Sequence, residues 1–201
     1  PAKLAGRPVP TSLFELSDPA WKGETAFSMP LFGTSLTHCA ALRQQLGPDQ
    51  MKQWLDGSLA NGMQVVDGNA VVKDRVVAGL YTWGFTDTDD ANSAIEDGAP
   101  VKMVIPDQDG IGTLVIPNTV SILKNCPHPE QARRLVDYLL SAEVEQRLAA
   151  GRSLQIPLHQ GVELPAGVPD ISQLKVMQVD YETMAAEFTD TLNWLRQAVD
   201  R

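Results

Sequence analysis

The sequence predicts an α/β fold, in which helices pack on the faces of a sheet. In its first half, short apolar runs alternate with amphipathic segments in the order β-α-α-β-α-β-α-β, and this alternation is typical of such sheets. The chain has 201 residues, of which 43% are hydrophobic and 20% charged. This balance indicates a globular protein with a substantial core.

Charge and hydropathy exclude two classes of partner. The net charge of −9 argues against nucleic acid, whose binding needs a basic surface. No apolar run approaches the length of a membrane span, and the opening residues do not form a signal peptide.

We expect a chain that opens on Pro to be processed, trimmed or part of a longer product. Cys39 and Cys126 lie far apart in the sequence, and we expect both to be free thiols.

The first strand and the two helices that follow it have clear end signals. Apolar residues predict a strand over 24–29 that ends at Pro30. Helical spacing predicts a helix over 35–46, which Gly47-Pro48 ends, and a second helix over 48–60.

Shorter elements complete the first half. The pattern predicts strands over 63–66, 81–86 and 101–105, with helices over 70–78 and 91–97 between them.

The second half is richer in helices. Apolar β-branched residues predict strands over 113–116 and 120–123, separated by a proline. Helices are expected from Pro129 to Leu140, over 141–148 and over 181–199. The first of these carries an apolar stripe expected to face a core, formed by Ala132, Leu135, Val136, Leu139 and Leu140.

Three predicted strand-to-helix loops carry polar residues, and in α/β sheets such loops gather beyond the carboxyl ends of the strands, where ligands bind. The first loop, 33–37, follows the first strand with a glycine and three hydroxyl residues. The other two are 67–69 and 87–90. The candidate ligand-binding residues are Gly33, Thr34, Ser35, Thr37, Asp67, Asn69, Asp87 and Asp89.

The loop at 33–37 suits an anion. The first N–H groups of a helix have no internal partner and point outward, and Thr34, Ser35 and Thr37 add hydroxyl groups beside them. The alternative is ordinary capping of the helix by Thr34 or Ser35, which most helices need.

The acidic run from Asp87 to Asp90 allows two interpretations. It can hold a hard metal ion or an amine, or it can cap the helix and complement its dipole. It is not a calcium loop, because Asn92 stands where a glycine is needed and Gly98 where a closing glutamate is needed. The three histidines lack metal-ligand spacing, and no cofactor is expected.

Five segments in a fixed order carry a family resemblance. They are PLFGTS at 30–35, VDGNAVVKDRV at 66–76, GTLVIPNTV at 112–120, PHPEQA at 127–132 and VDYLLS at 136–141. Together they resemble the solute-binding proteins of bacterial ABC importers, in the ferric-iron-type branch of the two-lobed periplasmic binding protein fold. The resemblance spans about residues 10 to 160.

The resemblance implies a periplasmic-binding-protein-like two-lobe fold, one lobe largely complete and the other partial. Residues 10–108 would form the lobe with the ligand loops, and residues 109–201 would return to the second lobe with C-terminal helices. Iron-binding members use two adjacent tyrosines after the strand that corresponds to 81–86. This sequence has Thr88-Asp89-Asp90 there, a departure that weakens the case for ferric iron.

The function implied is that of a periplasmic, monomeric, non-enzymatic solute-binding component that delivers its ligand to an ABC permease in the membrane. The ligand would be a small anion, either an organophosphate or phosphonate, or ferric iron, bound in part at the start of the first helix. Two alternatives stay open: a hydrolase that uses Asp87 and Asp89 as acid and base, and a ligand-sensing regulatory domain of the same fold. No nucleophile-elbow, phosphate-loop or zinc motif supports the enzyme.

Overall fold

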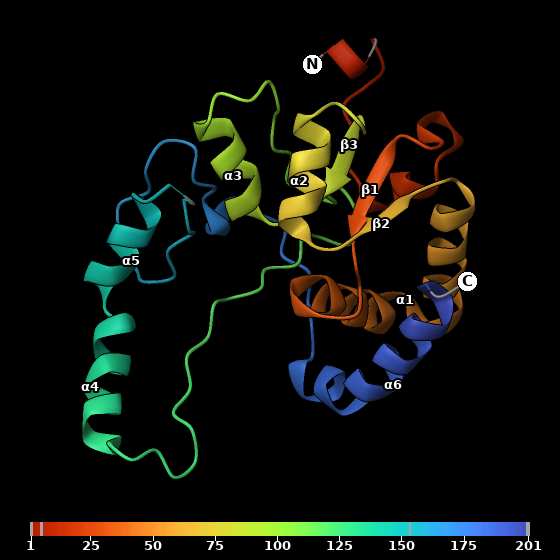
Figure 1. Ribbon diagram of the computed structural model, residues 1–201. Coiled ribbons are helices and arrows are strands. Elements are labelled where there is room, and N and C mark those ends of the chain that lie inside the picture. Colours follow the sequence, from red (N-terminus) through yellow and green to blue (C-terminus); the bar gives the residue numbers. More distant parts are fainter. Residues whose placement is uncertain (1, 5, 153, 200–201) are drawn as a thin grey trace. The chain divides into compact units, whose positions relative to one another are not determined.

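The computed structural model describes residues 2–4, 6–152 and 154–199 (Figure 1). The chain divides into two compact units: unit 1 is formed by residues 1–115 and 174–201, and unit 2 by residues 116–173. This division differs from the predicted one at 10–108 and 109–201. Its physical reason is that the last helix packs within unit 1 and not with the segment that precedes it.

Unit 1 is built around a parallel sheet of three strands in the order β2-β1-β3 (Figure 1). The strands are β1 (Thr25–Ser28), β2 (Gln64–Val66) and β3 (Trp83–Phe85). Every residue of β1 is buried, as expected of a central strand that helices cover on both faces. The sheet confirms the predicted α/β class, and both strand pairs are parallel.

Three helices connect or follow these strands: α1 (Gly33–Ala60), α2 (Asn69–Val77) and α3 (Thr88–Glu96). Helix α1 is interrupted at Gly47, which has φ 75° and ψ 163°, so the two predicted helices meet there as one kinked element. Helix α3 begins at Thr88, three residues before the predicted start, because Asp87 occupies the N-cap position.

Short 3-10 helices and the last long helix complete unit 1. They are η1 (Ala2–Leu4), η2 (Leu13–Ser17), η3 (Pro19–Trp21) and α6 (Tyr181–Val199). Helix α6 packs against α1 and buries Met184 and Leu195, two of the apolar residues that its sequence pattern places on one face. The guanidinium of Arg43 on α1 donates a hydrogen bond to the buried hydroxyl of Thr191, with an N–O distance of 3.0 Å.

Three predicted strands are wrong: 101–105, 113–116 and 120–123 have no strand structure. An isolated parallel bridge between Thr113 and Val176 is formed in this region. A β-branched run becomes a strand only when another strand pairs with it, and no described strand lies beside these three segments.

The two chain segments that lead into and out of unit 2 lie side by side in unit 1. The N–H of Thr113 donates to the carbonyl of Lys175, and the N–H of Met177 donates to the carbonyl of Thr113, each at 2.9 Å. Gly112 has φ 87°, and a Cβ atom there would lie 2.8 Å from the nitrogen of Met177. Only glycine fits this close approach without a backbone shift.

The acidic turn before this bridge is anchored to the start of η2. Asp107 is buried, and its carboxylate accepts hydrogen bonds from the hydroxyl of Ser12 at 2.5 Å and from the N–H of Leu13 at 3.3 Å. The side-chain amide of Gln108 makes two hydrogen bonds to the backbone of Lys175. Its nitrogen donates to the Lys175 carbonyl, and its oxygen accepts from the Lys175 N–H. The turn therefore fixes where the chain leaves unit 1.

Unit 2 contains α4 (Pro129–Leu139), α5 (Ala142–Ala149) and η4 (Ile171–Gln173). Its buried described residues are Ala149, Pro157 and Val168. Helix α4 has no buried residue, so the prediction that its apolar stripe faces a core is wrong for these 201 residues. The stripe lacks a covering element among the described residues of unit 2.

Two whole-chain expectations are also tested. Among the described residues, no helix combines the length and apolar character needed to cross a membrane. Cys39 is buried, Cys126 is half-buried, and both are free thiols, as the sequence predicted.

Candidate ligand-binding site

The three polar loops lie at one edge of the sheet because β1, β2 and β3 are parallel. Helix α1 follows β1, helix α2 follows β2 and helix α3 follows β3. Each helix therefore begins at the edge where the strands end, the place where ligands bind in open α/β sheets. The first turn of α1 and the first residue of α2 bring Thr34 and Asn69 to this edge, with Asp87 directly before α3.

These three residues form one hydrogen-bonded cluster. The Thr34 hydroxyl donates to the Asp87 carboxylate, with distances of 2.9 Å to Oδ2 and 3.1 Å to Oδ1. The Asn69 amide nitrogen donates to Asp87 Oδ2 at 2.6 Å and to the Thr34 hydroxyl oxygen at 2.8 Å. Residues 34, 69 and 87, far apart in the sequence, thus meet as predicted by the topology.

Two further hydroxyl residues support the cluster. The Ser35 hydroxyl donates to the Asn69 side-chain oxygen at a long 3.4 Å, while the Thr86 hydroxyl donates to the Asn69 backbone carbonyl at 3.0 Å. Thr86 was not among the predicted site residues. Its position directly before Asp87, at the end of a strand, was the signal that could have identified it.

The start of α1 offers unpaired backbone donors beside the cluster. The N-cap residue, Phe32, makes no side-chain capping bond, and the first turn contains no acidic residue. The alternative of capping by Thr34 or Ser35 does not occur, because both residues lie inside the first turn of α1 and the N-cap position is held by Phe32. The positive end of the α1 dipole is therefore available to an anion.

Asp87 faces the cluster and does not cap its own helix, since α3 has no side-chain capping bond. Burial raises the pKa of this carboxyl, although its hydrogen bonds from Thr34 and Asn69 act in the opposite direction. The carboxylate is half-buried beside the α1 dipole, and it remains an acceptor for a ligand hydroxyl or ammonium group.

Asp87, Asp89 and Asp90 together form an acidic group. One carboxylate oxygen from each lies within 4.8 Å of the others. Burial, followed by the nearby charges of Asp89 and Asp87, raises the pKa of Asp90. Oxygen ligands of this kind suit a hard cation, so this group has the chemistry to hold a metal ion.

Four predicted site residues, Gly33, Thr37, Asp67 and Asp89, lie apart from the cluster's hydrogen bonds. Asp67 is exposed. Gly33 is the exposed first residue of α1, and the Thr37 hydroxyl donates to its carbonyl at 3.2 Å. Asp89 lies near the cluster because its carboxylate is within 4.8 Å of that of Asp87.

His38 lies in the core one turn after Thr34, and the sequence left open whether it faced core or cleft. Its ring is buried and meets the Phe85 ring edge-on, with 4.7 Å between the ring centroids. Its Nε2 atom has no hydrogen-bond partner among the residues that the structure describes, and burial lowers the pKa of His38 to about 4. His38 is therefore a neutral packing residue behind the site.

The sequence is similar to known bacterial proteins. A model of the family described as "Bacterial extracellular solute-binding protein" matches residues 1–182. An uncharacterised protein of Haemophilus influenzae is 31% identical over 188 residues, which covers 92% of this chain and 53% of that protein. Iron uptake protein A1 of Synechocystis is 27% identical over 172 residues, with 80% and 47% covered. The chain spans about half the length of these curated relatives.

Solved structures share the fold. The periplasmic binding protein AfuA from Actinobacillus pleuropneumoniae, solved with exogenous fructose-6-phosphate bound, has a TM-score of 0.86 and 25% identity, covering 99% of this chain and 63% of its own. Iron-bound HitA from Pseudomonas aeruginosa has a TM-score of 0.80 and 23% identity, covering 98% and 64%. These similarities confirm the two-lobed periplasmic binding fold predicted from the sequence, of which this chain supplies a part.

Proposed function

Because this chain belongs to the family of bacterial extracellular solute-binding proteins, we propose that it contributes one ligand-binding wall of an ABC importer's solute-binding component. The component acts in the periplasm as a monomer and passes its ligand to a membrane permease. It binds without catalysis. The matched relatives support this proposal, since their names describe uptake and binding proteins.

The observation that carries the proposal is the cluster of Thr34, Asn69 and Asp87 beside the start of α1. It places a carboxylate acceptor next to unpaired N–H donors. The donors suit a phosphate or phosphonate group, and the carboxylate suits a hydroxyl or ammonium group. Gly33, Ser35, Thr37, Asp67 and Asp89 line the same edge of the sheet as further proposed contacts.

The pairing of donors and carboxylate selects the ligand class. Two like charges about 4 Å apart repel by roughly 1 kcal/mol in water and by about 4 kcal/mol near a protein surface. Asp87 therefore disfavours a bare phosphate dianion. A ligand that carries both a phosphate and a hydroxyl or amine offsets this repulsion by donating to Asp87. The solved relative with fructose-6-phosphate bound supports this class of ligand.

Ferric iron is the second candidate. The acidic group of Asp87, Asp89 and Asp90 favours it, as does the iron associated with two of the similar proteins, iron uptake protein A1 and iron-bound HitA. The sequence has three tyrosines, at positions 81, 138 and 181, so it lacks the adjacent pair that iron-binding members use. We therefore place the organophosphate or phosphonate first.

Calorimetric titration of the complete reading-frame product tests the proposal. For Asp87→Asn we expect fructose-6-phosphate to bind at least about tenfold more weakly, since a lost hydrogen bond to a charged group costs about 1.5–3 kcal/mol. Inorganic phosphate should bind severalfold more tightly, because the repulsion is gone. Asp109→Asn removes the same charge from an exposed turn and should change neither affinity.

Other results would overturn the assignment. Equal affinities of wild type and Asp87→Asn for both probes would place the ligand elsewhere. A coloured complex with ferric citrate, lost in Asp87→Asn, would favour the iron alternative. Release of phosphate from the sugar phosphate would favour the hydrolase.

A further inference from the structure

Lys73 is a partly buried cation on the face of α2 that carries Asn69. Its side chain is 23% exposed, and its ammonium group pairs with the Asp74 carboxylate at 2.9 Å. Residues 69 and 73 are one helical turn apart, so their side chains lie on the same face of α2, about 6 Å apart along its axis. Because the Asn69 amide donates to Asp87, Lys73 lies on the cluster's side of α2, one turn further along.

The acidic first turn of α3 lies within electrostatic range of Lys73. Helices α2 and α3 pack against each other, and Asp90 is a half-buried residue of this first turn. Burial raises the pKa of Asp90, and the charges of Asp89 and Asp87 raise it further. The charge of Lys73 lowers the same pKa. The packing of the two helices thus brings one cation to the acidic group.

The ion pair with Asp74 does not cancel this positive charge. The Asp74 side chain is 68% exposed, against 23% for Lys73, so water screens the carboxylate more strongly than the ammonium group. The charge of Lys73 accordingly acts on Asp90 more strongly than the charge of Asp74 does, and in the opposite direction. A net positive influence of Lys73 therefore remains at the acidic group.

The acidic group and the start of α1 attract ligands of opposite charge. The carboxylates of Asp87, Asp89 and Asp90 favour a cation, whereas the positive end of the α1 dipole beside Thr34 favours an anion. A nearby unit positive charge weakens the attraction for a cation and strengthens the attraction for an anion. The balance between the two kinds of ligand therefore depends on Lys73.

We propose that Lys73 is a specificity-determining counter-ion of the site, which favours a phosphate-bearing ligand over a metal ion through its charge and without contact with the ligand. Its ammonium group offsets part of the negative charge of the acidic group and repels any cation that these carboxylates would hold. The inference rests on the function proposed above for the identity of the anion. The effect on cations is separate from that function, so two probes of opposite charge test the two claims apart.

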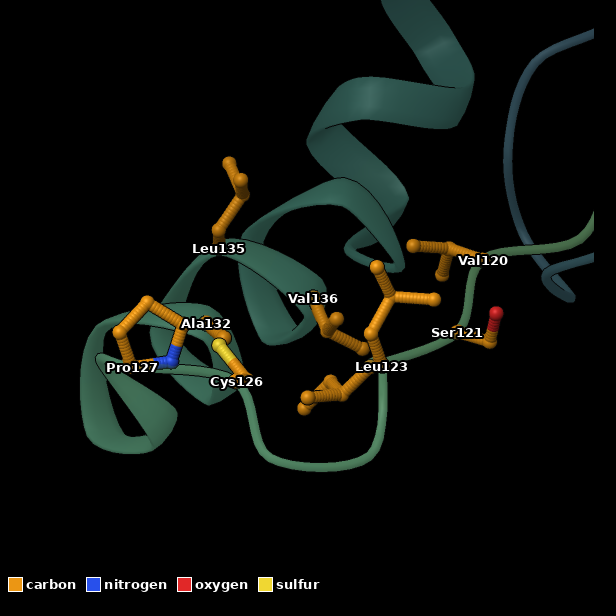
Figure 2. A pocket seen from close by; sticks show the side chains of 9 residues that line it. Val120, Ser121, Leu123, Cys126, Pro127, Ala132, Leu135 and Val136 are labelled. Atoms are coloured by element: carbon orange, nitrogen blue, oxygen red, sulfur yellow. The ribbon is translucent and has the colours of Figure 1, made fainter.

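The groove beside α4 in unit 2 lacks such a cation. It has a volume of about 270 Å³, and Figure 2 shows apolar side chains around it, among them Leu123, Ala132 and Val136. None of the described residues that line it is charged. A phosphate group there would lose its water without gaining an ionic partner, so the edge of the sheet in unit 1 matches an anion better than this groove does.

Titration of the complete reading-frame product with Tb³⁺ and with fructose-6-phosphate tests the inference. Tb³⁺ is a hard trivalent cation that prefers oxygen ligands, and its luminescence reports binding near tryptophan; calorimetry follows the sugar phosphate. For Lys73→Gln we expect Tb³⁺ to bind at least about tenfold more tightly and fructose-6-phosphate about threefold more weakly, since the Coulomb energy scales with the product of the charges. Salt at about 0.5 M should shrink both changes by screening.

Three further variants separate the charge of Lys73 from other causes. Arg75→Gln removes the same charge from an exposed position of α2 and should change neither affinity. Lys73→Arg keeps the charge and should bind both probes as the wild type does. Adding Asp90→Asn to Lys73→Gln should remove the gain in Tb³⁺ affinity, because the ion then loses one of its carboxylates.

Three results would overturn the inference. The first is an equal Tb³⁺ affinity of wild type and Lys73→Gln. The second is a change in Arg75→Gln as large as in Lys73→Gln, which would mean that only the net charge of the protein matters. The third is Lys73→Arg behaving like Lys73→Gln, which would assign Lys73 to packing.

The function proposed above fails in a different way. A complete product that binds no fructose-6-phosphate, while Lys73→Gln still gains affinity for Tb³⁺, would overturn the assignment of the ligand and support the role of Lys73 in excluding cations.

Discussion

Units 1 and 2 follow the same sequence rules but differ in how they satisfy them. In unit 1 the stripe of α6 buries Met184 and Leu195 against α1, and β1 pairs with a strand on each side. In unit 2 the stripe of α4 stays exposed, and residues 119–122 pair with no described strand. The difference shows that an apolar stripe predicts which face of a helix can be buried. Whether that face is buried depends on another element of the fold that packs against it.

The largest effect is expected in the core of unit 1. Phe27 is fully buried on β1, stacked on Phe85 with 5.8 Å between centroids and edge-on to Trp54 at 6.1 Å. Phe27→Ala should lower the free energy of unfolding by about 3–5 kcal/mol. Denaturant titration followed by tryptophan fluorescence measures this loss, because Trp21, Trp54, Trp83 and Trp194 all belong to unit 1. A loss below about 1 kcal/mol would contradict the described core.

The next effect is a dependence of unit 1 stability on pH. His38 has its pKa lowered from 6.5 to about 4 by burial. Between these values the unfolded chain binds more protons than the folded chain, so stability falls as pH falls from 6.5 to 4, by about 3 kcal/mol at most. Glu24, whose pKa is lowered to about 2 chiefly by its hydrogen bond from Arg7, loses its contribution only below pH 4.5.

The variant His38→Leu isolates this effect. It removes the titrating group while keeping an apolar side chain at the buried position. We expect the difference in stability between pH 7 and pH 4.5 to shrink relative to wild type. An identical pH profile in the two proteins would show that His38 is not buried in the neutral form.

A smaller effect is expected where the chain enters and leaves unit 1. Gly112→Ala places a Cβ within 3 Å of the 175–177 backbone at a residue with φ 87°, and we expect a loss of about 1–3 kcal/mol. Gly110→Ala is a matched control, because the nearest atom to its Cβ, the Asp107 carbonyl oxygen, lies 3.7 Å away. Equal stabilities of the two variants would contradict the close approach.

The smallest effect separates the two units most sharply. Leu135→Ala on α4 should change the stability of the 201-residue chain by less than about 0.5 kcal/mol, since exposed substitutions rarely cost more. The matched substitution Leu195→Ala on α6, whose apolar stripe is buried against α1, should cost about 2–5 kcal/mol. Thermal unfolding of the wild type and the two variants makes the comparison. An equal cost for the two substitutions would contradict the exposure of the α4 stripe.

Local patterns predicted most elements of unit 1. The signal at Gly47-Pro48 acts within a few residues, and α1 bends there. The runs at 101–105, 113–116 and 120–123 failed because a strand needs a partner distant in sequence. The same reason explains why the stripe of α4 was wrongly assigned to a core.

The site divides in a similar way. The alternation of strands and helices predicted that the loops carrying Thr34, Asn69 and Asp87 would gather at one edge of the sheet, beyond the carboxyl ends of the strands. The sequence could not decide whether Asp87 caps α3 or accepts a hydrogen bond from Thr34, because both interactions use the same carboxylate oxygens. Thr86 was missed for a related reason, because its bond to the Asn69 backbone depends on how two loops pack.

The most direct test of the ligand site is an amide chemical-shift titration of the 201-residue chain with fructose-6-phosphate. The account predicts that the largest shifts occur at the backbone amides of Gly33, Thr34 and Ser35 and at the side-chain amide of Asn69, even where binding is weak. Saturable shifts confined to other residues, with these four signals unchanged, would contradict it.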